Sequence, residues 1–167
     1  PNFLPYMGCS KQNIQFQNQS SSDYPGNMQY QWKVFSPQDE LLYTSNLTQP
    51  QFQFDTAGTY KVFLSVTLLE TCTDSIKKAV EIRNNPPITF SYSNVCAGQI
   101  TTFTDLTQVP SHEVIIERKW LFGDGNTSNL PNPTHQYANA GIYNVSLFNR
   151  SINGCADTLT KEVQIHA

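Results

Sequence analysis

Hydrophobic and polar residues alternate along much of this chain. The alternation at 143–147, where Tyr, Val and Leu are separated by Asn and Ser, recurs at 60–66, 76–82 and 159–165. A period of two places successive side chains on opposite faces of a half-buried β-strand. No stretch keeps a period of 3.6 over three turns, so the pattern predicts an all-β chain without helices.

Clusters of turn-forming residues separate these segments at intervals of about 8–12 residues, which is typical of a small antiparallel sandwich of immunoglobulin-like type. The clusters lie at 21–23, 25–27, 56–58, 123–126 and 153–154. In the second half of the chain, the strands are expected at 88–95, 99–106, 115–122, 126–129, 134–138, 142–149 and 157–166.

The sequence repeats itself. Shifted by 83 positions, residues 44–82 match residues 127–165 at 16 positions without a gap. Before this stretch the offset is 88, as between Trp32 and Trp120, because the first copy has a longer hairpin, and farther upstream it is 87, as between Phe16 and Phe103. The chain is therefore expected to contain two copies of one fold.

The two copies predict two immunoglobulin-like β-sandwich domains, at 1–83 and 88–167, joined by a linker at 84–87. Two prolines in the linker favour an extended, semi-rigid spacer. Because the chain begins at Pro1 and the repeat runs to both ends, we expect the sequence to be a segment of a longer, multi-repeat protein.

Matching aromatic residues are expected to form the two cores. A Trp on the third strand and a Tyr opening the sixth follow the immunoglobulin-like pattern. The expected core residues are Trp32 and Tyr60 in the first copy, Trp120 and Tyr143 in the second, together with Phe16, Phe54, Phe103 and Tyr137.

Charge is sparse. Only 14% of the residues are charged, the net charge is −3 and the isoelectric point is about 5.5. This balance provides no basic field for nucleic acid, and no apolar run approaches the ~20 residues that span a membrane. We therefore expect no nucleic-acid partner, no membrane insertion and a monomer.

Three motifs in the second copy resemble the PKD (polycystic kidney disease) domain. They are a Trp-Leu-Phe-Gly-Asp-Gly hairpin at 120–125, a Pro-Thr-His-Gln-Tyr segment at 133–137 and a Gly-Ile-Tyr-Asn-Val strand at 141–145. The resemblance covers nearly all of 88–167. The first copy keeps the Trp, Pro, Gly and Tyr of these motifs but lacks Gly-Asp-Gly, so it is similar to a divergent member.

The cysteine-containing segments at 96–98 and 154–158 are similar to those of PKD repeats in large cell-surface proteins of Bacteroidetes, including gliding and adhesion proteins. This resemblance implies an extracellular, secreted β-sandwich without catalysis. It implies a structural spacer that contributes to adhesion. The alternative that it implies is a carbohydrate-binding accessory module of a secreted hydrolase.

Four cysteines allow three pairings. One reading pairs them within each repeat, as Cys9–Cys72 and Cys96–Cys155. In an immunoglobulin-like strand order, however, Cys96 and Cys155 lie at opposite poles, roughly 20–25 Å apart, whereas a disulfide needs Cα atoms within about 7 Å. The second reading is a disulfide between repeats, Cys9–Cys155, and both readings remain open at this point.

Candidate chemistry is otherwise thin. The three histidines, at 112, 135 and 166, lack metal-ligand spacing, and no nucleophile or phosphate-loop motif occurs. No cofactor is expected; Asp124 and Asn126 are the calcium candidates, because loop oxygens suit that ion and some PKD domains hold calcium.

Aromatic rings beside amides and hydroxyls could bind a sugar. The candidate rings are Tyr24, Tyr30, Tyr43 and Tyr92. The expected partners are thus neighbouring repeats of the same chain and a surface polysaccharide or protein.

Overall fold

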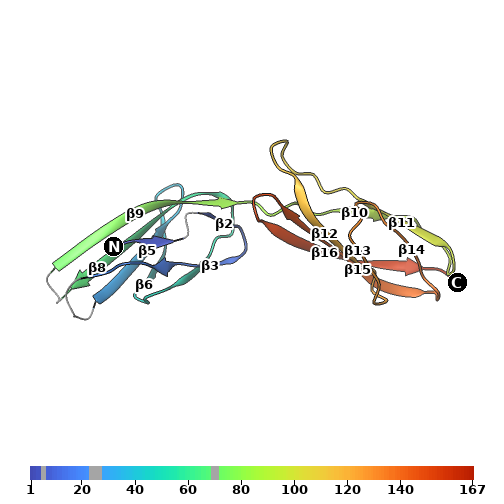
Figure 1. Cartoon of the computed structure of the whole chain (residues 1–167), viewed down its shortest axis with the longest axis horizontal. Coiled ribbons are helices and arrows are strands. Elements are labelled where there is room, and N and C mark those ends of the chain that lie inside the picture. Colours follow the sequence, from blue (N-terminus) through green and yellow to red (C-terminus); the bar gives the residue numbers. More distant parts are fainter. Residues whose placement is uncertain (5–6, 23–27, 69–71) are drawn as a thin grey trace. The chain divides into compact units, whose positions relative to one another are not determined.

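The structure is a computed structural model in which the chain divides into two compact units, unit 1 at Pro1–Asn84 and unit 2 at Asn85–Ala167. It describes residues 1–4, 7–22, 28–68 and 72–167. Every regular element in these ranges is a strand, so no helix that could cross a membrane is found there (Figure 1). The predicted all-β class is confirmed.

Unit 2 is a sandwich of two sheets. Its three-stranded sheet has the order β10 (Phe90–Tyr92), β11 (Ile100–Asp105), β14 (Thr134–Gln136). Its four-stranded sheet has the order β13 (Thr127–Ser128), β12 (Ile115–Leu121), β15 (Gly141–Ser151), β16 (Ala156–Ile165). All of these pairs are antiparallel. The strands fall where the alternation predicts them, with ends that differ by a few residues.

Unit 1 repeats this plan with a larger second sheet. The five-stranded sheet has the order β2 (Met7–Cys9), β9 (Cys72–Arg83), β8 (Gly58–Leu68), β5 (Met28–Phe35), β6 (Leu41–Ser45). Two strand pairs complete the unit: β1 (Phe3–Leu4) with β4 (Gln17–Asn18), and β3 (Asn13–Gln15) with β7 (Gln51–Gln53). The β2–β9 pair is parallel, an arrangement that the period-two pattern alone does not specify.

One buried tryptophan spans each sandwich in the same way. Trp32 and Trp120 have no exposed surface. The indole Nε1–H of Trp32 donates to the carbonyl oxygen of Leu47 at 2.9 Å, and that of Trp120 donates to Leu130 at 3.0 Å. Leu47 and Leu130 are themselves matched residues of the two copies. Each indole is therefore buried with its one polar group satisfied.

A lysine ties the first strand of each unit to its last. Lys78 Nζ donates to the carbonyl oxygen of Phe3 at 2.7 Å and lies 4.9 Å from the centroid of the Phe3 ring. Lys161 does the same to Phe90, at 2.6 Å and 4.7 Å. Both phenylalanines in turn meet the tryptophan edge-on, at 5.2 and 5.1 Å. The lysine stems thus cover the ring while their charged ends stay hydrogen-bonded.

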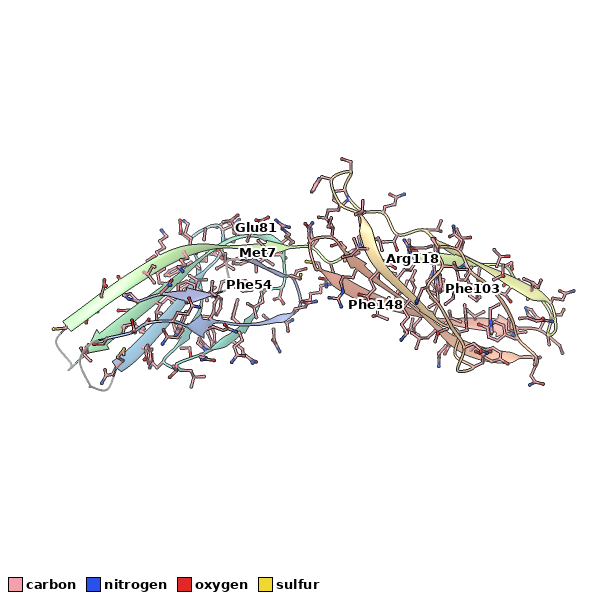
Figure 2. The ribbon with its side chains drawn as sticks, in the orientation of Figure 1. Met7, Phe54, Glu81, Phe103, Arg118 and Phe148 are labelled. Atoms are coloured by element: carbon pink, nitrogen blue, oxygen red, sulfur yellow. The ribbon has the colours of Figure 1, made fainter. Side chains whose placement is uncertain are left out.

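The remaining core residues are aromatic and branched aliphatic side chains from both sheets of each unit; Figure 2 labels Phe54 and Phe103, one in each core. The expected core residues Phe16, Phe54, Tyr60, Phe103 and Tyr137 are all buried.

Tyr143 differs from its counterpart Tyr60, because it is only partly buried. Its ring lies 4.1 Å from that of Tyr137, and its hydroxyl donates to Asn139 at an exposed turn.

Candidate functional site

The Gly-Asp-Gly hairpin of unit 2 depends on the backbone conformation of its two glycines. Gly123 and Gly125 have φ values of +84° and +93°, which side chains other than glycine rarely adopt. A Cβ on Gly123 would lie 2.8 Å from the carbonyl oxygen of Asn144. The glycines therefore let the hairpin approach β15 closely and turn the carboxylate of Asp124 back toward the sheet.

Asp124 is fully engaged within the hairpin. Its Oδ1 accepts from the backbone N–H of Asn126 at 3.0 Å, and its Oδ2 accepts from the Asn126 amide at 3.1 Å. The Nε2 of His135 lies 2.7 Å from the same Oδ2. Burial raises the pKa of Asp124, but these hydrogen bonds outweigh it and leave the pKa below its ordinary value.

The ring of His135 packs as an aromatic residue. It stacks on Phe122 at 4.3 Å and 6°, and meets the edge of Tyr137 at 4.6 Å. The hydroxyl of Tyr137 donates to the Phe122 carbonyl at 3.0 Å, and burial together with the charge of Asp124 raises its pKa. In unit 1, Phe52 occupies the position of His135 and packs against Phe54. His135 and Asp124 thus form a polar clamp where unit 1 has an aromatic cluster.

These contacts bear on the calcium candidates. A Ca²⁺ ion takes six to eight oxygen ligands. Asp124 already serves three donors, and the Asn126 amide nitrogen is directed at Asp124. Across the ranges that the structure describes, no cluster of three or more His, Cys, Asp or Glu side chains could hold a metal ion. The oxygens of Asp124 are therefore engaged within unit 2, and calcium binding at Asp124 and Asn126 stays a prediction.

A second polar cluster lies in the interior of unit 2. Asp105, at the end of β11, accepts a hydrogen bond from the Nε of Arg118 at 2.6 Å and from the Asn149 amide at 3.1 Å (Figure 2 labels Arg118). Asp105 also accepts from the backbone of Thr107 at 2.9 Å. Its side chain is 4% exposed and that of Arg118 is 21% exposed. Burial raises the pKa of Asp105, but the hydrogen bonds from Thr107, Arg118 and Asn149 leave it below the ordinary value.

This cluster is specific to the second copy, and sequence reasoning missed it. Unit 1 keeps the local turn, since Ser20 N–H donates to Asn18 as Thr107 does to Asp105. Its positions equivalent to Arg118 and Asn149 hold Tyr30 and Val66. The signal available in the sequence was an acid, a base and an amide at three inward positions of unit 2 that are uncharged in unit 1.

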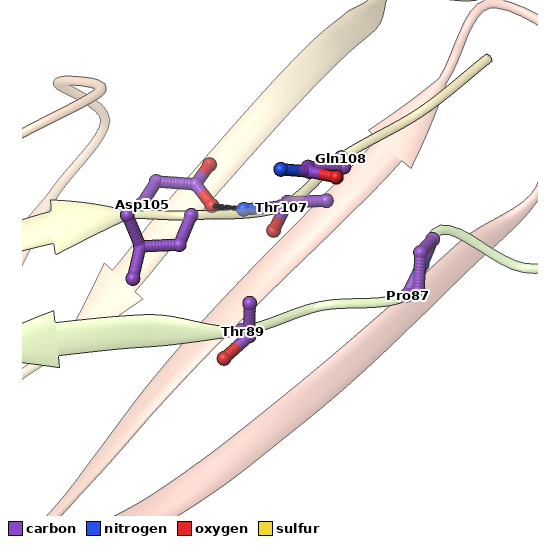
Figure 3. Close-up of a pocket in the computed structure, with 6 residues that line it drawn as sticks. Pro87, Thr89, Asp105, Thr107 and Gln108 are labelled. Atoms are coloured by element: carbon purple, nitrogen blue, oxygen red, sulfur yellow. Dashed lines mark hydrogen bonds between the residues drawn. The ribbon is translucent and has the colours of Figure 1, made fainter.

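A groove of about 630 Å³ passes beside this cluster (Figure 3). It is lined by Pro87, Thr89, Asp105, Leu106, Thr107 and Gln108. Because Arg118 neutralises Asp105 from the interior, the groove offers no free charge to a ligand.

Unit 1 has a different groove, of about 540 Å³, along β5 and β8. It is lined by Met28, Gln29, Tyr30, Gln31, Asn46, Thr48, Ser65 and Thr67. Six of these eight side chains are uncharged amides or hydroxyls.

The groove includes one of the four sugar-binding candidates, Tyr30. Tyr43 packs on Phe52, and Tyr92 lies 6.3 Å from Phe103. Tyr24 lies outside the described residues.

The cysteines of each unit lie at opposite poles. In unit 1, Cys72 begins β9, whereas Cys9 pairs with Arg83 at the end of that strand. In unit 2, Cys155 directly precedes β16, whereas Cys96 bridges His166 directly after it. Eleven steps of ~3.3 Å separate these ends by about 35 Å, far beyond the ~7 Å that a disulfide spans.

Two of the four sulfurs are oxidised. Cys9 and Cys155 are disulfide-bonded, and Cys96 is an exposed thiol. Both half-cystines are buried, at 9% and 1% exposure. Pairing within a repeat therefore fails on distance, and the disulfide-bonded sulfurs are the ones at the two poles that flank the linker.

The three histidines lie in three different surroundings. His135 belongs to the clamp, His112 is exposed beside Glu113 at 3.9 Å, and His166 ends the last strand.

Comparison with known protein families finds a match for the second unit. The PKD domain family model matches residues 83–167. A microbial collagenase of Vibrio alginolyticus is 39% identical over 70 residues, which span 42% of this chain and only 9% of the length of the collagenase.

Two solved structures resemble half of the chain. The PKD1 domain of Vibrio anguillarum Epp is 24% identical, with a TM-score of 0.45 over 50% of this chain and 95% of its own. The PKD1 domain of the Vibrio cholerae metalloprotease PrtV is 26% identical, with a TM-score of 0.44 over 50% of this chain and 99% of its own.

Replacement of Asp105 tests the interior cluster. Asp105→Asn leaves the guanidinium of Arg118 without its counter-charge, which we expect to cost about 2 kcal/mol. In hydrogen exchange at pH 7, the core amides of Val145 and Leu147 should then exchange about 30-fold faster, while Val62 and Leu64 of unit 1 serve as the internal control.

The lowered pKa of Asp105 fixes the direction in which its contribution to stability changes with pH. Because the folded pKa of Asp105 is lowered, its contribution is present above the ordinary value of 3.8 and is lost as the pH falls through the folded value. The difference between variant and parent should therefore shrink in acid. Equal exchange at pH 7 would show that the cluster does not stabilise unit 2, and Asp157→Asn, at an exposed carboxylate of the same unit, is the matched control.

Proposed function

This chain belongs to the PKD domain family, and we propose that it is a non-catalytic structural spacer from the extracellular part of a larger protein, built from two repeats of which the first is a divergent PKD-type domain. Proteins similar to this chain include a microbial collagenase, over 9% of its length, and a domain of a metalloprotease. A small module within a larger enzyme is an accessory part, and a spacer that presents other domains is the role that its geometry supports best.

The observation that carries this proposal is that the chain enters each unit at one pole and leaves it at the opposite pole. In unit 2, Phe90 lies beside Lys161 and, further along, Cys96 bridges His166. The first strand thus runs in the same direction as the last. The chain enters at the pole of the β15–β16 turn and leaves at the opposite pole. A module with its ends at opposite poles adds its full length to an array.

We further propose a disulfide between the repeats, Cys9–Cys155, as the device that stiffens the joint. Cys9 lies beside Arg83, where the chain leaves unit 1, and Ser10 N–H donates to the Arg83 carbonyl at 2.8 Å. Cys155 lies at the pole where the chain enters unit 2. The short linker, with Pro86 and Pro87, joins the two poles that each carry a half-cystine, which supports this pairing.

Extracellular location follows from the same chemistry. Disulfides persist in secreted and surface proteins and are rare where thiols are kept reduced. A buried half-cystine in each unit supports an oxidising compartment. The low charge and the abundance of amides and hydroxyls suit a surface exposed to solvent and polysaccharide, where the module would also contribute to adhesion.

Peptide mapping without reduction tests the joint. We expect one proteolytic peptide pair that links Cys9 to Cys155 and disappears on reduction. A Cys9→Ser variant should lose the pair, and a Cys72→Ser variant, the matched control at the other end of β9, should keep it. A peptide that joins Cys9 to Cys72 would contradict the proposal.

The groove of unit 1 favours a second candidate, a neutral carbohydrate-binding module. Gln29, Gln31, Ser65 and Thr67 present amides and hydroxyls along adjacent strands, and none of the described residues that line the groove is charged. Uncharged donors and acceptors on this face match the hydroxyls of a neutral sugar chain, whereas the ring of Tyr30 packs against the core on the other face of β5.

Affinity electrophoresis in gels that contain a neutral polysaccharide, dextran or a mixed-linkage β-glucan, tests this candidate. Binding in the groove predicts retardation that weakens at least tenfold in Gln29→Ala/Gln31→Ala. The matched control, Gln51→Ala/Gln53→Ala, removes two exposed amides of β7 and should leave retardation unchanged. Unretarded migration in both gels, or equal retardation of both variants, would rule out this site.

A further inference from the structure

Cys96 occupies in unit 2 the place that Cys9 occupies in unit 1. Cys9 pairs in parallel with Arg83 at the end of β9, and Cys96 forms a parallel bridge with His166 at the end of β16. The next residue donates its N–H to the same strand end in both units, from Ser10 to Arg83 and from Ala97 to His166, each at 2.8 Å. The two sulfurs therefore stand at matching points of matching poles.

Their oxidation states differ. Cys9 is a half-cystine with 9% of its surface exposed, whereas Cys96 is an exposed thiol. The backbone beside Cys96 turns through Gly98, with φ of +80°, and a Cβ there would meet no atom within 4 Å. The neighbourhood of Cys96 is thus open at the pole where the chain leaves unit 2.

The complementary position is the turn between the last two strands of a repeat. Cys155 sits there, held by a tight turn in which Ser151 N–H donates to the Cys155 carbonyl at 2.8 Å and Gly154 N–H donates to Ser151 at 2.9 Å. The matched residue of the other repeat is again a cysteine, Cys72. Each repeat therefore carries one sulfur at its exit pole and one at its entry pole.

We propose that Cys96 is the attachment point for a further repeat, forming a disulfide with the cysteine at the β15–β16 type turn of a PKD-type domain that follows it. This inference rests on the proposed Cys9–Cys155 joint, which it extends into a series. In the reaction, the two thiols lose two protons and two electrons to a disulfide oxidant, such as oxidised glutathione or a thiol oxidase. One S–S bond forms while the oxidant is reduced to its dithiol.

A three-repeat chain tests the inference directly. His166 and Ala167 correspond to Arg83 and Asn84, so appending a second copy of residues 85–167 after Ala167 reproduces the native spacing. In the added copy, the counterpart of Cys96 is replaced by Ser and that of Asp157 by Asn, so that its cysteine peptide differs in mass from the native one and Cys96 itself is the labelled residue. After folding in a glutathione buffer, peptide mapping should find Cys96 linked to the added copy's counterpart of Cys155. Iodoacetamide, which labels Cys96 in the parent chain, should label it at least tenfold less.

Two variants of this three-repeat chain separate the possible outcomes. Replacing the added counterpart of Cys155 by Ser should restore full labelling of Cys96 and leave the Cys9–Cys155 peptide in place. If Cys9–Cys155 is found but Cys96 stays fully labelled, the series is wrong and the proposed joint survives. If Cys9–Cys155 is itself missing, both proposals fall. A tryptophan emission maximum matching that of the parent, from the indoles buried in each repeat, shows that the chain is folded.

Discussion

Each sandwich depends on one indole held between its sheets. The tryptophan is the largest side chain of each core, and its nitrogen donates to the carbonyl of a leucine in the segment that leads to the opposite sheet. Phenylalanines from the first strands pack on it at nearly equal distances in both units, and a lysine covers one of those rings from the last strand. Because the same contacts recur at matched positions, the ends of each unit, and the sulfurs they carry, are placed alike.

The alternation of hydrophobic and polar residues and the internal duplication were enough to predict the strands. Half-buried strands have a sequence period of two, and the same pattern at matching positions of both copies supports each assignment. The clamp between Asp124 and His135 and the cluster around Asp105 could not be found in this way. Their members lie 11 to 44 residues apart and meet only when the sheets pack. The same limit hid the parallel β2–β9 pair. Tyr143 packs against the core of unit 2 but is only partly buried, because a match to buried Tyr60 does not fix how far the ring is covered.

The two repeats share one fold but differ in the polar and aromatic contacts that they carry. Unit 2 carries the Gly-Asp-Gly hairpin with its clamp and the Asp105–Arg118 ion pair. In unit 1, aromatic contacts of Phe52 replace the clamp, Tyr30 and Val66 stand in place of Arg118 and Asn149, and a groove rich in amides and hydroxyls lies along the larger sheet. Buried ion pairs contribute little net stability compared with apolar packing. What the two units share is the direction of the chain, which enters each unit at one pole and leaves it at the opposite pole. A spacer needs this property.

Single-molecule stretching of the oxidised chain from its two ends tests the spacer account most directly. A Cys9–Cys155 bridge shields everything between the two sulfurs, so only about 20 residues can be drawn out, on the order of 70 Å. Full reduction should release the whole chain, on the order of 550 Å. An extension near 150 Å in the oxidised state, the length left by one bridge within each repeat, would contradict the account.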